Sequence, residues 1–391
     1  MVAPTKTTTK QHKSMKKITI AVDSFKGSLT SAEVAEAVAK GIRTLLPHCE
    51  VSKVSIADGG EGTAEALVES LGGEWVQMVA GDPLGRPIGV RYGVIDEGKC
   101  AVVEMASASG LPLLTPAERN PMRTSTIGTG EMIADAIERG CRKFLVAIGG
   151  SATNDCGMGM LHALGYRFVD TQGAVLAPCG EALSQIDHID DSGVLPLLGE
   201  CKFVVACDVT NPLYGPNGAA HIYAPQKGAT PQMVELLDEG LRNFARVVRL
   251  YNGREVDFVE GAGAAGGLGA GFVGVLGAKL QRGIDMVMEA LRFEEILLGS
   301  DLAITGEGCI DYQTVMGKAP CGVLYAATRQ GIPVVAIGGC VKWCEALRES
   351  SFAAIEAATP EGMSLEEAMR KEVAEENVRQ ATERIIRSMI I

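Results

Sequence analysis

The chain has 391 residues, of which 47% are apolar, and this length favours two domains over one. The formal net charge of -12 argues against nucleic acid or an anionic membrane surface as a partner. The longest apolar runs fall well short of the roughly 18 residues that a membrane span needs. An anionic small molecule remains compatible with this composition, because a few Lys or Arg residues decide its binding locally.

Residues 1–14 have no apolar core, so they are not a secretory signal and are interpreted as a disordered extension. The eleven cysteines include no CxxC pair, which is typical of reduced, mostly buried thiols in a cytoplasmic protein. The chain has only five histidines, so we expect carboxylates to carry any acid–base chemistry.

The first part of the chain alternates short apolar runs with amphipathic stretches, which predicts an α/β protein with a largely parallel sheet. A first strand is expected over residues 17–22, followed by a helix that Ser31 caps. A second strand is expected over residues 51–57, and an Asp/Gly-rich turn and another helix follow it.

The pattern then changes, because residues 75–105 contain three strand-like runs separated by short turns. This spacing predicts an antiparallel meander. Further strands are expected over residues 144–148 and 203–207. Near the end the first pattern returns, with strands expected over the ranges 301–305, 333–337 and 352–357.

The recurrence of the first pattern predicts a discontinuous domain interrupted by an insertion. Residues 15–72 and 285–391 would form a five-stranded doubly wound domain, and residues 73–284 would form an inserted α/β domain with a mixed sheet. Ligands of such sheets bind at the carboxyl ends of the strands. Asp23, Asp58 and Glu307 would all lie there.

Two loops after predicted strands carry charged residues among glycines. Asp23, Ser24 and Lys26 follow the first strand, and Asp58 begins the sequence DGGEGT after the second. A carboxylate here could bind a metal or orient a hydroxyl, and Lys26 could pair with a carboxylate or phosphate. A solvated turn and a helix cap are the alternatives.

The most informative stretch is FLVAIGGSATNDCGMG, over residues 144–159. A buried strand ends in glycines, hydroxyls and a carboxylate, which are suited to phosphate or metal binding. Thr129 lies in a second glycine-rich segment, TSTIGTGE, before a helix expected over residues 132–139. An ordinary Thr cap is the alternative there.

Three further motifs lie later in the chain. Asp208 follows the strand expected at residues 203–207, and Lys318 lies in the sequence MGKAP. Gly261, Gly263 and Gly266 fit the letters GxGxxG, but only residues 256–259 could be the preceding strand. The many glycines that follow disfavour the crossover helix of a dinucleotide fold. The chain has neither a Walker A sequence nor the HRD and DFG motifs of protein kinases.

Taken together, the ordered blocks resemble the type-1 glycerate kinases of bacteria from about Lys16 to the C-terminus. The blocks are DSFKGSL, ADGGEGT, EMASASGL, TSTIGTGE, IGGSATND, ACDVTNPLYG, APQKGA, GAGAAGGLGAG, ITGEG and GKAP. The resemblance implies ATP-dependent phosphorylation of D-glycerate, generally to 2-phosphoglycerate, with Mg²⁺. It also implies a flavodoxin-like domain and an inserted domain with a restriction-endonuclease-like sheet. Cys309 stands where the family usually has Arg.

Phosphoryl transfer to glycerate requires a cation for its carboxylate and a base for its hydroxyl. We expect glycerate in an interdomain cleft, with Asp208 as the base and either Asp155 or Asp58 as the Mg²⁺ ligand. Base and metal roles among Asp23, Asp58, Asp155 and Asp208 stay open. The substrate-binding candidates are Asp23, Ser24, Lys26, Arg86 and Thr129, with Lys26 also a catalytic candidate, and the ATP-binding candidates are Gly149, Gly150, Ser151, Asn154, Gly261, Gly263, Gly266 and Lys318.

Two other functions are compatible with parts of the pattern. The sequence GAGAAG and the α/β pattern could belong to an NAD-dependent oxidoreductase, and a two-domain chain could bind a small metabolite without catalysis. The acidic residues at strand ends disfavour both, because simple binding needs no carboxylates placed for a metal. No nucleic-acid or membrane partner is expected, and the protein is expected to be a cytoplasmic monomer or homodimer.

Overall fold

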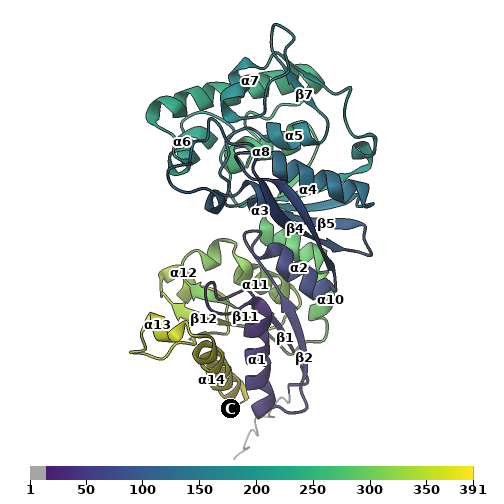
Figure 1. The fold of residues 1–391 in the computed structure, drawn as a ribbon. Coiled ribbons are helices and arrows are strands. Elements are labelled where there is room, and N and C mark those ends of the chain that lie inside the picture. The colour runs from purple at the N-terminus through teal and green to yellow at the C-terminus, as the bar shows by residue number, and fades with distance from the viewer. Residues whose placement is uncertain (1–14, 391) are drawn as a thin grey trace, which may run out of the picture. The chain divides into compact units, whose positions relative to one another are not determined.

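The computed structural model of the protein describes residues 15–390, and the extension expected over residues 1–14 lies outside them. The described chain divides into two compact units, each with its own sheet (Figure 1). Unit 1 comprises the residues up to Ile56 and those from Arg292 onward, and unit 2 is the continuous segment Ala57–Leu291. These boundaries differ from the expected ones at 72/73 and 284/285.

Unit 2 begins earlier than expected because helix α2 (Thr63–Leu71) packs on its sheet. The helix contacts strands β4 (Pro87–Ile95) and β5 (Cys100–Glu104). The approach is so close that a Cβ added to Gly93 would lie 2.3 Å from a methyl carbon of Val68. The chain therefore leaves unit 1 directly after its second strand.

The sheet of unit 1 has five parallel strands in the order β13-β12-β11-β1-β2. Its strands are β1 (Lys17–Val22), β2 (Glu50–Ser55), β11 (Leu302–Ile310), β12 (Val334–Val341) and β13 (Ala354–Ala357). Its helices are α1 (Ser31–Leu45), α10 (Phe293–Leu297), α11 (Ala319–Arg329), α12 (Glu345–Arg348), α13 (Leu365–Ala368) and α14 (Lys371–Ile390).

Side chains alternate along β1 between the two faces of this sheet. Ile18, Ile20 and Val22 are fully buried in a core that α1 and α14 share, and these two helices pack on each other (Figure 1). Helix α11 packs on β1, β11 and β12 outside that core. The sheet is thus covered by helices from segments far apart in the sequence.

The start of α1 differs by one residue from the prediction. Thr30, not Ser31, is the N-cap, and its side chain accepts from the backbone N–H of Glu33 at 3.3 Å. Glu33 in turn accepts from the backbone N–H of Thr30 at 2.9 Å. This reciprocal capping box satisfies two backbone donors at the helix end, which a cap at Ser31 would not do.

Strands β11 and β12 are longer than expected, because pairing continues through their glycines. Glu307 pairs with Gly338, and Cys309 pairs with Cys340. A Cβ on Gly306 would lie 2.2 Å from the carbonyl oxygen of Ile337, so only glycine fits this close strand pairing. Glu307 therefore lies within a strand and not beyond its end.

Unit 2 contains a mixed sheet in the order β10-β9-β6-β5-β4-β3, in which the β3–β4 and β4–β5 pairs are antiparallel and the other pairs are parallel. The expected meander is thus confirmed. The other strands of this sheet are β3 (Glu74–Gly81), β6 (Lys143–Ala147), β9 (Lys202–Ala206) and β10 (Lys279–Gln281). Strands β7 (Arg167–Val169) and β8 (His188–Asp190) form a separate antiparallel pair. The remaining helices are α3 (Ala106–Ser109), α4 (Ile127–Glu138), α5 (Met158–Ala163), α6 (Ala219–Tyr223), α7 (Pro231–Asn252), α8 (Ala264–Gly274) and α9 (Gly283–Ala290).

Several elements of unit 2 were not predicted from the sequence. The short strands β7, β8 and β10 were missed, and helix α4 begins at Ile127, five residues before its expected start. Residues 256–259 form no strand, which removes the strand that a dinucleotide fingerprint would need. Among residues 15–390, no helix combines the length and apolar character needed to span a bilayer.

Candidate functional site

The loop between β2 and α2 lies over the carboxyl ends of strands in unit 2. A Cβ on Gly59 would lie 3.0 Å from Ala206, the last residue of β9, and one on Gly149, just after β6, would lie 3.9 Å from Gly60. The backbone N–H of Ala64 donates to Glu104, the last residue of β5, at 2.9 Å. The loop thus joins three neighbouring strand ends, where ligands of parallel sheets bind.

Asp58 and Asp208 come together at this edge. Asp208 follows β9, and its carboxylate accepts from the backbone N–H of Gly283, the first residue of α9, at 2.9 Å. Partial burial of its carboxyl group raises the pKa of Asp208, and the negative charge of Asp58 raises it further, while the Gly283 hydrogen bond opposes the rise. The structure therefore pairs two of the carboxylates that the sequence singled out.

Gly283 maintains this pairing, since a Cβ there would lie 2.0 Å from the carbonyl oxygen of Asp58. We expect Gly283→Ala to displace the 58–60 loop and to lower the free energy of unfolding by about 1–3 kcal/mol in chemical denaturation. Gly199→Ala is the matched control, because a Cβ added there would have no other atom within 4 Å. Equal stability of the two variants would contradict this close packing.

The loop after β6 is open at its start and buried at its end. Gly149 and Gly150 are exposed, Ser151 is 7% exposed, and Asn154 is fully buried. Gly150 has a φ of +76°, a conformation that favours glycine. Among the ATP-binding candidates in this loop, the exposed glycines and Ser151 are the residues that a phosphate can reach.

Lys227 is the main residue that the sequence analysis missed. It is 2% exposed, and its Nζ donates to Ser151 Oγ at 2.7 Å and to the carbonyl oxygen of Thr153 at 2.6 Å. Burial lowers the pKa of Lys227 to about 7, although the negative charge of Asp155 opposes this shift. In the sequence, this lysine lies in the block APQKGA, where no local pattern marks it as functional.

Asp155 is fully buried and holds two loops together. Its carboxylate accepts from the backbone and hydroxyl of Thr126, both at 2.8 Å, from Gly157 N–H at 3.2 Å and from Gly159 N–H at 3.1 Å. Burial raises its pKa, and these hydrogen bonds oppose the rise. Four protein donors leave little room for a metal ion, so Asp58 fits the expected Mg²⁺ ligand better than Asp155 does.

Buried polar atoms around this loop lack partners within residues 15–390. They are Thr153 Oγ1, Ser125 Oγ and both side-chain polar atoms of Asn154. Buried polar groups are normally hydrogen-bonded, so these atoms are suited to bind ordered water. Asn154, an ATP-binding candidate, belongs to this group.

The second glycine-rich stretch packs against the first. A Cβ on Gly266 would lie 2.0 Å from the carbonyl oxygen of Thr153, and one on Gly263 would lie 2.2 Å from that of Pro212. A Cβ on Gly261 would lie 2.6 Å from the Cys207 sulfur. All three glycines are buried, so their packing against these loops accounts for them without a nucleotide.

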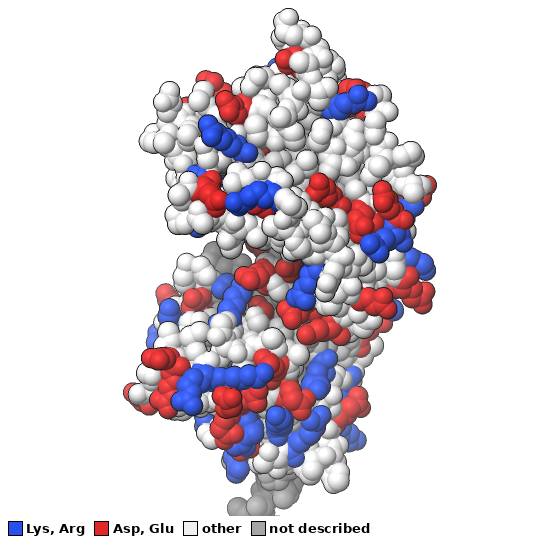
Figure 2. Space-filling view, in the orientation of Figure 1, with Lys and Arg blue, Asp and Glu red and all other residues white. Residues whose placement is uncertain are grey.

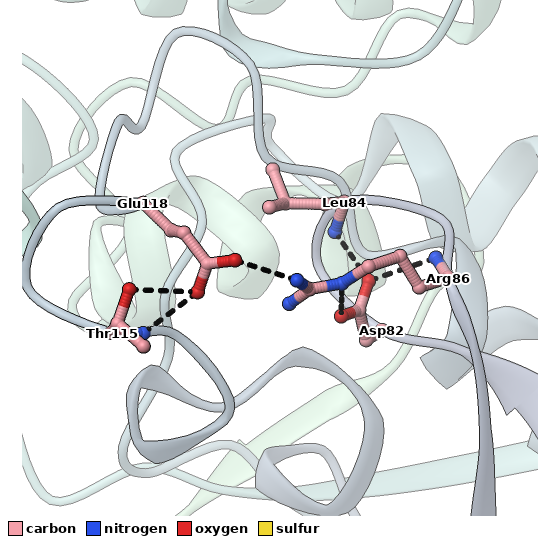
Figure 3. A network of polar contacts seen from close by, with 5 residues as sticks. All are labelled: Asp82, Leu84, Arg86, Thr115 and Glu118. Carbon is pink, nitrogen blue, oxygen red and sulfur yellow. Dashed lines mark hydrogen bonds and ion pairs between the residues drawn. The ribbon is translucent and has the colours of Figure 1, made fainter.

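Arg86 and Thr129, two substrate-binding candidates, are both engaged within unit 2. The Arg86 side chain donates to Asp82 at 2.5 Å and to Glu118 at 2.6 Å (Figure 3). Asp82 also accepts from the backbone N–H groups of Leu84 and Arg86, which closes the turn between β3 and β4. Thr129 is fully buried, and its hydroxyl is 2.8 Å from Ser109 Oγ.

Unit 1 has a separate polar group around the end of β1 and the neighbouring part of β11. Asp23 is 7% exposed, its backbone N–H donates to Gly306, and its carboxylate accepts from Ser24 N–H at 2.6 Å. Lys26 is exposed nearby in the same loop.

Glu307 and Lys318 form an ion pair of 3.5 Å in unit 1, and Thr314 donates to Glu307 at 2.6 Å. Lys318 is the N-cap residue of α11, so its charge lies beside the first turn of that helix. The two candidate lysines, Lys26 and Lys318, thus both belong to unit 1, whereas Arg86 belongs to unit 2.

Two further observations concern metal binding and the surface charge of the protein. Within the described residues, no cluster of three or more His, Cys, Asp or Glu side chains could hold a metal ion. A Mg²⁺ ion held by one or two carboxylates usually completes its coordination with water and phosphate oxygens. On the face drawn in Figure 2, Lys and Arg are mixed with Asp and Glu and form no continuous basic patch.

Comparisons with known proteins give a consistent result. The model of the glycerate kinase family matches residues 18–390. A glycerate kinase of Bacillus subtilis (strain 168) is 46% identical over 353 residues, covering 90% of this chain and 92% of the relative. A glycerate 2-kinase of Escherichia coli (strain K12) is 45% identical over 323 residues, covering 83% and 85%. A crystal structure from Salmonella typhimurium LT2, described as a proposed glycerate kinase 2, has a TM-score of 0.89 at 42% identity and covers 96% of this chain and 98% of its own.

Proposed function

Because this chain belongs to the glycerate kinase family, we propose that it transfers the γ-phosphoryl group of ATP to D-glycerate and forms 2-phosphoglycerate. The observation that best supports a reaction at a defined site is the pairing of Asp58 and Asp208 at the strand ends of unit 2. A hydroxyl that attacks phosphorus needs a nearby base, and one with a raised pKa is a stronger proton acceptor.

Asp208 would accept the proton of the reacting glycerate hydroxyl. It is exposed and therefore accessible to a substrate, and its hydrogen bond to Gly283 holds the carboxylate in place. Its raised pKa gives it a higher proton affinity than an ordinary aspartate has. Asp58 lies beside Asp208 and is proposed for metal binding.

Asp58 would hold Mg²⁺ together with phosphate oxygens. The ion would neutralise charge on the transferred phosphoryl group, in the way that divalent cations act in phosphoryl transfer. The donor set fits, since a single carboxylate with substrate oxygens and water is an ordinary Mg²⁺ environment.

This metal assignment predicts weaker metal binding in Asp58→Asn. With ATP present, Mn²⁺ titrated into the protein and followed by electron paramagnetic resonance should bind roughly tenfold more weakly to the variant, or weaker still. Asp155→Asn should leave Mn²⁺ affinity unchanged if the protein remains folded. A loss of affinity in folded Asp155→Asn alone would assign the metal to Asp155 instead.

The nucleotide would meet the loop after β6 through Gly149, Gly150 and Ser151. Lys227 donates to Ser151 Oγ, so the hydroxyl proton of Ser151 is left to donate to another acceptor, such as a phosphate oxygen. Lys227 would act through Ser151 and is a positioning residue.

The cations of unit 1 would bind the anionic parts of the substrates. Lys26 is exposed and is proposed for the glycerate carboxylate, with Asp23 and Ser24 beside it, and Lys318 is proposed for phosphate. Arg86 is a weaker candidate for the carboxylate, because Asp82 and Glu118 already accept from its guanidinium.

We also infer that unit 1 is flavodoxin-like. Its five strands, numbered along the chain, have the order 2-1-3-4-5, which is the order of that doubly wound fold. The description of the unit 2 sheet as restriction-endonuclease-like stays a prediction.

The test is ADP release measured with D-glycerate, L-glycerate, glycolate and D-lactate as acceptors. We expect turnover with D-glycerate, and phosphorus NMR of the product should show phosphate on the C2 hydroxyl. Phosphate on C3 would overturn the product assignment, and no ADP release with any acceptor would overturn the kinase assignment. The comparisons support neither an oxidoreductase nor a non-catalytic binding protein.

A further inference from the structure

Two cysteines lie side by side at the ends of neighbouring strands in unit 1. Cys309 on β11 and Cys340 on β12 are direct partners in the register of two parallel strands. Partners in register point to the same face of a sheet, and adjacent strands are about 4.8 Å apart. This spacing falls within the range of roughly 4.4–6.8 Å between the Cα atoms of a disulfide.

The two thiols also contact each other and differ in exposure. Cys340 is exposed, and Cys309 is partly buried. Burial raises the pKa of the Cys309 thiol, and its hydrogen bond with Cys340 contributes to the rise. Cys340 is therefore the thiol that a reagent in solution meets first, and Cys309 is positioned to react second.

From this geometry we propose that Cys309 and Cys340 form a reversible disulfide when the protein meets a low-molecular-weight disulfide. The Cys340 thiolate attacks one sulfur of the reagent, a mixed disulfide forms, and the first reagent thiol leaves. The Cys309 thiolate then attacks the Cys340 sulfur and displaces the second reagent thiol. The two cysteines lose two protons and two electrons, and the reagent disulfide is reduced to two thiols.

A disulfide between Cys309 and Cys340 would lie close to Glu307 and its partners. Cys309 lies two residues after Glu307 on the same strand, and residues two apart share a face of a sheet. Glu307 is the acceptor of the Thr314 hydroxyl and the partner of Lys318. The disulfide would fix β11 to β12 beside this group, which belongs to the phosphate-binding part of the proposed site.

The test uses the folded full-length protein and glutathione disulfide, followed by alkylation of free thiols and digestion with trypsin. The digestion sites place each relevant cysteine in its own peptide: residues 293–318 contain Cys309, residues 330–342 contain Cys340, and residues 343–348 contain Cys344. We expect the first two peptides to be joined, with a mass about 2 Da below their sum, and to separate on reduction.

Two variants make the result decisive. Cys309→Ser should stop at the mixed disulfide of Cys340 with glutathione, because the second thiol is missing. Cys344→Ser should still form the joined peptide, because Cys344 is not in register with either cysteine. A link from Cys340 to Cys344, or a stable mixed disulfide on Cys340 of the unsubstituted protein, would overturn the proposal.

Discussion

Asp208→Asn is expected to lower kcat with D-glycerate by about 10²–10⁴-fold while leaving the fold intact. Asparagine has nearly the same shape and can still accept from the backbone N–H of Gly283, so the local structure should persist. It cannot accept the proton of the glycerate hydroxyl. Steady-state ADP release measures the effect, and circular dichroism confirms the fold.

The pH dependence gives a sharper test of the same assignment. A base must be ionised to act, so kcat/KM should fall on the acid side through the pKa of Asp208. That pKa is raised partly by the charge of Asp58 in the metal-free protein. The acid limb of kcat/KM for MgATP, which reports the free enzyme, should therefore move to lower pH in Asp58→Asn. Asp285→Asn is the comparison variant: Asp285 also raises the pKa of Asp208, but less than Asp58 does, so the acid limb should move in the same direction by a smaller amount.

Two outcomes would contradict this interpretation. An Asp208→Asn enzyme with nearly full kcat would remove Asp208 from the role of base. An acid limb that stays at the same pH in Asp58→Asn would show that the group titrating in the kinetics is not coupled to Asp58.

Lys227→Met is expected to reduce kcat/KM for ATP by about 10²-fold, the usual cost of losing one preorganised donor at a site of developing charge. Methionine has a similar length but cannot donate to Ser151, whose hydroxyl would then be free to turn toward protein acceptors. Ser151→Ala should cause a similar loss. The double variant should be no worse than either single variant, and additive losses would contradict an action through Ser151.

The same substitution should change how stability depends on pH. The pKa of Lys227 is lowered from 10.5 to about 7 in the folded protein. Between these values the unfolded chain binds the proton that the folded chain has lost, so this lysine makes stability rise with pH across the window. Below about pH 7 the folded protein carries a buried charge, and its destabilising effect is fully present.

Lys227→Met should therefore be more stable than the unsubstituted protein at pH 6, by on the order of a few kcal/mol. The advantage should shrink as pH approaches 10, where the lysine is close to neutral in both states. Urea denaturation at several pH values between 6 and 10 measures this difference. A difference that does not depend on pH would mean that Lys227 stays charged in the folded protein.

The local pattern of apolar and turn residues predicted most strands of this fold, but not the residues at which they end. Strand β1 was predicted over the range that it has in the structure, because its apolar residues alternate clearly and an Asp/Gly loop follows it. Strands β11 and β12 extend past their expected ends because pairing between them continues through glycine positions that usually mark turns. No property of one strand alone contains that information.

The candidate site was predicted unevenly for a similar physical reason. Asp208 and the loop after β6 follow strands and could be found from the order of the residues. Lys227 could not be found in this way. Its role depends on its contact with Ser151, which is 76 residues away in the sequence. The sequence predicts Asp155 as a metal ligand, but its carboxylate is occupied by four hydrogen-bond donors, three of them backbone N–H groups that no sequence pattern reveals.

The division of unit 1 between the two ends of the chain has a consequence for synthesis. Strand β1 is made first, yet its neighbour β11 begins at Leu302, after all of unit 2 has been translated. At about 5–20 residues per second, the last hundred or so residues take roughly 5–20 s to appear. During that time the emerging chain carries a completed unit 2 and an α1 whose apolar face lacks α14, so premature termination would release a protein with one folded half.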